Sequence, residues 1–275
     1  MTEFITDAVV LREVPYKEND RILTVLTPDS GLMTVGAKGV RNIKSKNSAA
    51  VQLFCYSELE IMQSGSRFTL KTATLKNGFF GLREDLNRYA LACYAADTVC
   101  SFCTSENDES EPFRLLLNMF YALSENKEKP LWQIKAAYEL KLCSVCGFMP
   151  DLESCAQCGR LSDGLNKPDD AFRAEGKYTF SLTESGLLCK DCFQKAEKSA
   201  SVYAEIPRSY TLALSYPALM AARYVTHAEI PRFLSFKLAE TAAPDFCEFA
   251  ERYLLHLAER GFDTLKYYKT LLQTL

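Results

Sequence analysis

The first eighty residues alternate between apolar and polar positions with the two-residue period of β-strands. We expect five strands, with approximate bounds 6–14, 21–27, 32–37, 51–62 and 68–75. Turn signals separate them. In the clearest, Pro28-Asp29-Ser30-Gly31, the proline presets φ and the glycine takes the position that needs a positive φ. Five short strands without a helical pattern between them are typical of a small Greek-key barrel of the OB type. A β-sandwich fragment or an SH3-like barrel is the alternative.

From Arg83 onward the apolar positions recur with the helical period of about 3.6 residues. We expect helices over about 86–104, 112–124, 131–145 and 212–225, and a last one that opens at Pro244. Residues 151–200 are rich in glycine and cysteine, and most of them lack a helical pattern. The predicted fold is therefore α+β with several domains. Residues 1–81 form an OB-fold barrel, residues 82–150 and 201–275 form a helical domain, and residues 151–200 form a four-cysteine, zinc-ribbon-like insert within it.

Composition places the chain among globular proteins, since 48% of its 275 residues are hydrophobic and 24% are charged. Its first residues have neither a basic stretch nor a long apolar run, so we expect no secretory signal. No stretch is long and apolar enough to predict a membrane span. Eleven cysteines without an export signal indicate a reducing, cytoplasmic setting, where paired cysteines favour a metal site over disulfides.

Four Cys-x-x-Cys steps occur in the chain, and they begin at Cys100, Cys143, Cys155 and Cys189. The first lies on the apolar stripe of a predicted helix, which indicates core packing. The second lies in the last turn of a helix, and its role stays open. The last two lie outside any helical pattern, at turns that contain glycine. We therefore predict that the metal ligands are Cys155, Cys158, Cys189 and Cys192.

Four thiolates around one metal ion leave no open coordination position, so this site is predicted to be structural. Zinc is favoured because two paired steps suit a tetrahedral four-sulfur site, although thiolates alone do not exclude iron. We expect one Zn²⁺ ion, without which residues 151–200 are disordered.

The formal net charge is −3, but it is unevenly distributed. Residues 1–81 carry ten Lys and Arg against eight Asp and Glu, and a basic loop at 38–46 has no acidic neighbour from Leu32 to Cys55. An ordinary solvated loop is the simpler interpretation. A loop that projects from a small barrel is, however, where OB folds contact the nucleic-acid backbone. The predicted DNA-binding residues are Lys38, Arg41, Lys44, Lys46 and Arg21.

Other side chains of the barrel are candidates for a supporting role. Further basic residues on its strands are Arg12, Lys17, Arg67 and Lys71. Aromatic residues that offer faces for base stacking are Tyr16, Phe54, Tyr56 and Phe68. Aromatic residues at strand spacing are more often core residues, so none of them is assigned to a base.

Catalysis is not expected. The segment from Gly31 to Lys38 resembles a phosphate-binding loop but lacks its Gly-Lys-Ser/Thr ending, because Ala37 and Gly39 flank the lysine. With two histidines in the chain, no set of nucleophile, base and orienting group can be assembled. We therefore predict that the protein is not an enzyme and uses no nucleotide.

Ordered short motifs give the chain a family resemblance. They are Ala8-Val9-Val10-Leu11, Tyr16 to Arg21, Gly36 to Arg41 with Lys44-Ser45, Gly147 to Leu152, the step Cys155 to Gly159, and Gly186 to Cys192. In this order and spacing they resemble the bacterial RecO recombination-mediator family. Near the C-terminus the likeness weakens, because Lys266-Tyr267 stands where relatives tend to have Lys-Ser.

The resemblance implies an N-terminal OB domain, a helical domain and a zinc-binding insert. It also implies a cytoplasmic, nucleoid-associated DNA repair protein that binds single- and double-stranded DNA and anneals complementary strands. Such proteins act with RecR and the single-stranded-DNA-binding protein SSB to help load RecA, without nucleotide or membrane. The resemblance also places the basic loop on Lys38, Arg41 and Lys44.

Two other functions remain alternatives. One is a zinc-ribbon adaptor that contacts only proteins, in keeping with the acidic pI of about 5.6. The other is a redox or metal-dependent enzyme with Cys143 and Cys146 as a reactive dithiol.

Overall fold

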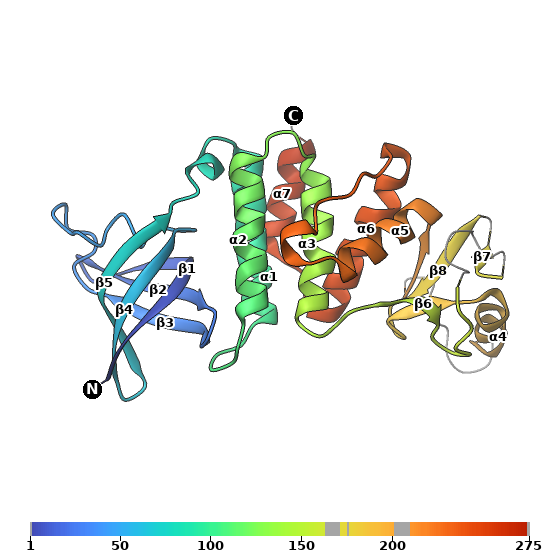
Figure 1. The fold of residues 1–275 in the computed structure, drawn as a ribbon, viewed down its shortest axis with the longest axis horizontal. Coiled ribbons are helices and arrows are strands. Elements are labelled where there is room, and N and C mark those ends of the chain that lie inside the picture. Colours follow the sequence, from blue (N-terminus) through green and yellow to red (C-terminus); the bar gives the residue numbers. More distant parts are fainter. Residues whose placement is uncertain (1, 163–170, 175, 201–209, 274–275) are drawn as a thin grey trace. The chain divides into compact units, whose positions relative to one another are not determined.

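The computed structural model describes residues 2–162, 171–174, 176–200 and 210–273 (Figure 1). The chain forms two compact units. Unit 1 comprises Met1–Leu131 and Gly261–Leu275, and unit 2 comprises Trp132–Arg260. The segments 163–170 and 175 of the predicted insert and the segment 201–209 of the predicted helical domain lie outside the described residues. Within the described residues, no helix combines the length and the apolar character that crossing a membrane requires.

The N-terminal part of unit 1 is a closed five-stranded barrel with the strand order β1-β2-β3-β5-β4 (Figure 1). Its strands are β1 (Thr2–Tyr16), β2 (Asp20–Thr27), β3 (Gly31–Ala37), β4 (Tyr56–Ser64) and β5 (Arg67–Asn77). Neighbours pair antiparallel except β3 and β5, which are parallel. This confirms the predicted OB-type barrel over the sandwich alternative.

The first strand closes the barrel because it pairs along both of its edges. Its first half pairs with β4 and its second half with β2, and the register shifts between Val10 and Arg12. A bulge of this kind bends a strand and increases its twist, as closure requires. Alternate side chains of the strands then point inward, and with Val40 and Val51 of the segment between β3 and β4 they form the barrel core. Its strand residues are Ala8, Val10, Leu23, Val25, Met33, Val35, Ala37, Leu59, Ile61 and Leu70.

The predicted fourth strand began too early. It was expected from residue 51, whereas β4 begins at Tyr56. Phe54 has a φ of 68°, in the left-handed region, and Cys55 donates its backbone N–H to the Gln52 carbonyl. The apolar run that resembled a strand is therefore a turn. Val51 and Phe54 are nevertheless buried, which explains their apolar character.

Three α-helices complete unit 1: α1 (Leu86–Phe102), α2 (Ser110–Glu125) and α7 (Asp263–Gln273). A short 3₁₀ helix, Phe80–Arg83, leads into them. The Asp85 carboxylate caps α1 by accepting the backbone N–H groups of Asn87 and Arg88, and the Arg88 guanidinium donates to the Leu123 carbonyl of α2. The last helix was not predicted; it packs beside α1, with Phe262 against Tyr94.

Unit 2 combines helices with a small sheet. Its helices are α3 (Leu131–Val145), α4 (Lys190–Ala200), α5 (Tyr216–His227) and α6 (Ala243–Ala258), with 3₁₀ turns at Ile230–Arg232 and Glu240–Ala242. The sheet has the order β10-β8-β9-β6, with β7 beside β8. Its strands are β6 (Asp151–Cys155), β7 (Arg173–Ala174), β8 (Lys177–Ser181), β9 (Gly186–Leu188) and β10 (Thr211–Leu214).

Two predictions for unit 2 need correction. The helix expected over 212–225 begins only at Tyr216, because Leu212 and Leu214 alternate with exposed neighbours in a strand. The helix α4 was not predicted within the insert. The predicted domain boundaries at 81, 150 and 200 stay a prediction, since the two compact units group the residues in another way.

Candidate nucleic-acid interface and metal centre

A pocket of about 520 Å³ lies on the barrel where the β1–β2 hairpin, β3 and the start of β5 meet. Its position follows from the parallel pairing of β3 with β5, which brings Phe68 opposite Val35 although the two lie far apart in the sequence. The pocket is lined by Tyr16, Lys17, Asp20, Arg21, Ile22, Thr34, Gly36, Ala37, Lys38, Ser66, Arg67, Phe68 and Thr69.

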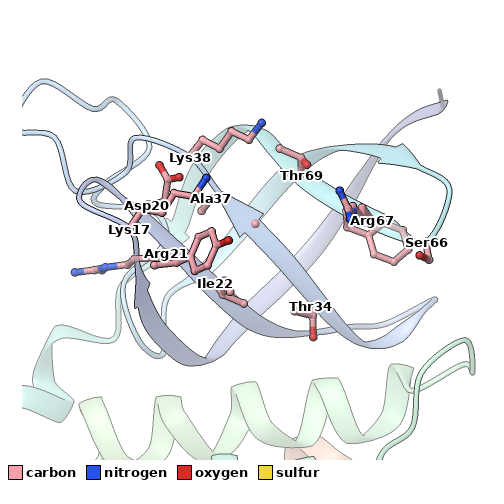
Figure 2. A pocket seen from close by; sticks show the side chains of 13 residues that line it. Lys17, Asp20, Arg21, Ile22, Thr34, Ala37, Lys38, Ser66, Arg67 and Thr69 are labelled. Atoms are coloured by element: carbon pink, nitrogen blue, oxygen red, sulfur yellow. The ribbon is translucent and has the colours of Figure 1, made fainter.

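Basic side chains stand at both ends of this pocket. Figure 2 shows Lys17, Arg21 and Lys38 toward one end and Arg67 toward the other. Lys17, Lys38 and Arg67 are exposed and have no ion pair among the described residues. Arg21 differs, because its guanidinium lies 2.5 Å from the Glu13 carboxylate, which offsets its charge. The pocket is therefore positively charged mainly through the three unpaired cations.

Asp20 is the acidic residue of the lining, and its carboxylate is engaged in holding the backbone. One carboxylate oxygen accepts the N–H of Gly39 at 2.8 Å, and the N–H of Arg41 donates to the Asn19 carbonyl at 3.0 Å. These two bonds join the β1–β2 hairpin to the first residues after β3. Gly39 has a φ of +65°, so the turn between these bonds needs a glycine.

The segment between β3 and β4 carries the remaining predicted contacts. Arg41, Lys44 and Lys46 are exposed and have no ion pair among the described residues. The segment is fixed at both ends, because Val40 and Val51 belong to the barrel core. The Asn47 side chain also bonds to β5, donating to the Lys71 carbonyl and accepting from the Ala73 N–H. We call residues 38–46 the basic loop.

Two basic residues named from the sequence are paired away from the pocket. Arg12 lies 2.6 Å from the Asp97 carboxylate of α1, and Lys71 lies 2.8 Å from both Glu3 and Glu60. Neither lines the pocket. The structure thus places Arg21 and Lys38 in the pocket lining, and Arg41, Lys44 and Lys46 on the adjoining loop.

Two pocket residues, Lys17 and Arg67, were named from the sequence only as supporting charges. Lys17 lies in the three-residue loop between Tyr16 and Asp20, where its φ is 54°. Arg67 begins β5 directly after the turn at Gly65. Lys17 joins the pocket through the consecutive pairings β1–β2 and β2–β3, whereas Arg67 joins it through the pairing of β3 with the distant strand β5, which nothing in the sequence near Arg67 indicates.

The four cysteines predicted as metal ligands form one group in unit 2. Their sulfur atoms all lie within 4.8 Å of one another. Cys155 ends β6, Cys189 follows β9, and Cys192 lies in the first turn of α4. The first step turns sharply, because Gly159 has a φ of +70° and donates its N–H to the Cys155 carbonyl. This bears out the glycine-containing turn expected after Cys158.

The geometry of these sulfurs suits a tetrahedral metal site. Zn–S bonds of about 2.3 Å put sulfur atoms roughly 3.8 Å apart in a tetrahedron. The sulfurs of Cys158 and Cys189 are 3.8 Å apart. Burial raises the pKa of the Cys155 thiol, but N–H groups of Cys189, Cys158 and Gln157 outweigh it and lower that pKa to about 6. Burial raises the pKa of Cys189, and burial with the neighbouring thiols raises the pKa of Cys192 to about 12. The donor set therefore fits a thiophilic cation.

The Cys-x-x-Cys step at the end of α3, Cys143 to Cys146, is separate from this group. Cys143 is fully buried and Cys146 half-buried, and within the described residues the only metal-binding group is the four cysteines named above. Burial raises the pKa of Cys143 well above the ordinary thiol value. A thiol of this kind is a poor nucleophile, so the geometry does not favour a reactive dithiol there.

The cysteine group is attached to the helices of unit 2 by two kinds of contact. Arg223 of α5 donates two hydrogen bonds to the Leu152 carbonyl of β6, at 3.0 and 2.7 Å. Phe180 of β8 packs against Phe249 and Tyr253 of α6, with ring centroids 4.8 and 5.6 Å apart. The small sheet thus contacts α5 and α6 through β6 and β8. The cysteines lie at the ends of β6 and β9 and in the segments that follow these strands.

Two protein-family models match most of the sequence. The family model described as Recombination protein O N terminal matches residues 1–79, and the one described as Recombination protein O C terminal matches residues 83–265. A protein of Acetivibrio thermocellus named DNA repair protein RecO is 29% identical over 266 residues, 97% of this chain and 96% of that protein. The DNA repair protein RecO of Alkaliphilus metalliredigens is 33% identical over 187 residues, 68% of this chain and 71% of that protein.

Proposed function

Because this chain belongs to the RecO family of DNA repair proteins, we propose that its barrel binds DNA through the pocket and the basic loop. The contacts are Lys38, Arg41, Lys44 and Lys46, with Arg21 in a lesser role because Glu13 offsets its charge. To these we add Lys17 and Arg67, which line the same pocket.

One observation carries this proposal: apart from Arg21, the cations of the pocket and loop are exposed and have no ion pair among the described residues, whereas Arg12 and Lys71 elsewhere on the barrel are paired. Unpaired cations repel one another, so the presence of six of them in the pocket and the basic loop does not stabilise the fold. They are Lys17, Lys38, Arg41, Lys44, Lys46 and Arg67. A phosphate backbone relieves this repulsion and releases its own counterions on binding. The acidic net charge of −3 does not oppose it, because residues 1–81 carry two more basic than acidic residues and the excess of acidic residues lies in the rest of the chain.

The rest of the family's activity is part of the same proposal. The protein anneals complementary single strands and, with RecR, helps load RecA onto DNA coated with SSB, in the bacterial cytoplasm at the nucleoid. It binds double-stranded as well as single-stranded DNA, and it catalyses no covalent step and uses no nucleotide. Residues 1–81 act as the DNA-binding domain, while residues 82–150 and 201–275 form a helical domain with the insert at 151–200.

We assign one structural Zn²⁺ ion to Cys155, Cys158, Cys189 and Cys192. The closed group of sulfur atoms supports this, since four thiolates fill a tetrahedral shell and leave no position for a substrate. When bound, the ion supplies a link between β6 and the segment around α4. The cysteines themselves supply negative charge that needs a cation at their centre.

The test of DNA binding is charge reversal in the basic loop, Arg41→Glu with Lys44→Glu, measured by the fluorescence anisotropy of a labelled oligothymidylate. At about 50 mM salt, loss of two phosphate contacts weakens binding to a single strand about sixtyfold, and the new carboxylates weaken it further. Arg232→Glu with Lys237→Glu is the control, because these exposed residues of unit 2 give the same change in net charge.

Annealing of two complementary oligonucleotides should fall in the loop variant and persist in the control. If the wild-type protein leaves the anisotropy unchanged at low salt, the DNA-binding proposal is wrong, and the adaptor that contacts only proteins takes its place. Equal affinity of the loop variant and the control would instead remove the loop from the interface.

A further inference from the structure

Four aromatic residues of the barrel offered faces for base stacking, and the structure separates one from the other three. Phe54 is buried and packs against Tyr89 and Phe120, with ring centroids 5.4 and 5.1 Å apart. Its ring faces belong to the interface between the barrel and the helices of unit 1. Phe54 is therefore a core residue.

Tyr56 and Phe68 are also engaged in the fold. The Tyr56 hydroxyl donates to Asp7 at 2.8 Å, and its ring meets Phe113 edge to face. The Phe68 ring is half-buried and packs edge to face with Phe4. These contacts fix both rings, so Phe68 forms part of the pocket wall and Tyr56 lies outside the pocket.

Tyr16 differs from them because it ends β1 at the pocket and the residue is 49% exposed. Its ring contact among the described residues is with Lys17, whose Nζ lies 5.4 Å from the ring centroid. An exposed tyrosine presents a flat apolar face that costs little entropy to hold in place. The Lys17 ammonium lies over this ring, so a nucleotide that contacts the ring has a cation close to its phosphate.

The space in front of Tyr16 suits a planar base. The pocket volume of about 520 Å³ falls within the range of small-molecule sites. Unpaired cations stand at both of its ends, and Thr34, Ser66 and Thr69 are also among its lining residues. A site for phosphate alone needs only the cations, whereas a hollow with an exposed ring at its edge also accommodates a base.

A second hollow on the barrel, of about 460 Å³, shares Phe68 with this pocket but has a different rim. The exposed carboxylates of Asp29 and Glu106 line it. Carboxylates repel phosphate groups, so a bound strand does not continue in that direction. The positively charged continuation of the pocket is the basic loop, through Lys38.

We propose that Tyr16 stacks on an unpaired nucleobase held in the pocket, and that this contact gives the barrel a preference for single-stranded over double-stranded DNA. The inference rests on the proposed DNA binding. Phosphates are available on both forms of DNA, but in a duplex each base is covered by its neighbours, and extruding one costs a few kcal/mol. The cations therefore bind either form, and Tyr16 adds affinity for single strands alone.

The test compares Tyr16→Ala and Tyr16→Phe with Tyr121→Ala, which removes another exposed tyrosine, from α2 of the same unit. Each is titrated with a labelled oligothymidylate and with a duplex of the same length. Tyr16→Ala should weaken single-strand binding about 5- to 150-fold, the usual effect of losing one stacked base. Duplex affinity should change less than about twofold, and the other two variants should match the wild type.

An oligonucleotide of abasic sites separates stacking from a general disturbance of the barrel. The wild-type protein should bind it more weakly than oligothymidylate, and Tyr16→Ala should cause no further loss on it. An equal loss on the abasic strand, on the duplex and on oligothymidylate would overturn the inference, as would no loss at all. Either result leaves DNA binding itself intact if the Arg41→Glu, Lys44→Glu variant still loses affinity.

Discussion

The pocket on the barrel and the four-cysteine group are both clusters of side chains of one chemical kind, but they are arranged in opposite ways. Apart from Arg21, the cations of the pocket and basic loop are exposed to solvent and have no ion pair among the described residues. The cysteine sulfurs point at one another and lie within 4.8 Å. A set of like groups that faces outward is suited to an external ligand, and a set that converges is suited to a single ion that stabilises the fold.

The largest expected effect concerns the cysteine group. Cys155→Ser with Cys158→Ser should abolish zinc binding, whose free energy in such sites is on the order of 10–16 kcal/mol. The segment around β6, β9 and α4 should then become sensitive to protease. DNA affinity should change less than about twofold, because the cations all belong to unit 1.

Zinc content by mass spectrometry and limited proteolysis measure this outcome. Cys143→Ala with Cys146→Ala is the matched control, and it should keep the zinc because these cysteines lie outside the group. Zinc retained by the Cys155→Ser, Cys158→Ser variant would contradict the ligand assignment. A large loss of DNA affinity in the same variant would contradict the separation of the two regions.

A smaller effect should distinguish two cations of the same strand. Arg67 and Lys71 both belong to β5, but Arg67 lines the pocket and Lys71 is paired with Glu3 and Glu60. Arg67→Ala removes one phosphate contact and should weaken single-strand binding about eightfold at about 50 mM salt. Lys71→Ala should change it less than about twofold, because that charge is already offset.

Anisotropy titrations on the two variants give the answer directly. Thermal unfolding should report little change for either, since exposed ion pairs contribute about 0–1 kcal/mol. If Lys71→Ala weakens binding as much as Arg67→Ala, then pairing does not decide which cations meet DNA, and the comparison between paired and unpaired charges fails.

Much of the fold was predictable from the sequence because its signals are local. The two-residue period of the strands and the helical stripes around Tyr138 and Phe249 depend on neighbours in the chain, and both were found. The errors arose where tertiary packing overrides a local pattern. Phe54 is apolar because it enters the core from a turn, and Leu212 and Leu214 are apolar because a short strand buries them.

The two candidate sites differed in the same way. The cysteine group could be predicted, because each Cys-x-x-Cys step has a local spacing that indicates a metal ligand. The basic loop was visible as a local cluster. The pocket was not, because it arises from the parallel pairing of β3 with β5, which adds Arg67 and Phe68 to a lining that also contains Lys38 and Tyr16. Only the folded barrel shows which charges are paired.

The most direct test of the central claim is the salt dependence of single-strand binding. With about −0.7 per phosphate contact, four loop contacts predict a log–log slope of about −3 for the wild-type protein, and the additional pocket cations make it steeper. The Arg41→Glu, Lys44→Glu variant should lose about 1.4 from the magnitude of that slope. A slope that is the same in both proteins would contradict the claim that the exposed, unpaired cations of the barrel bind the DNA backbone.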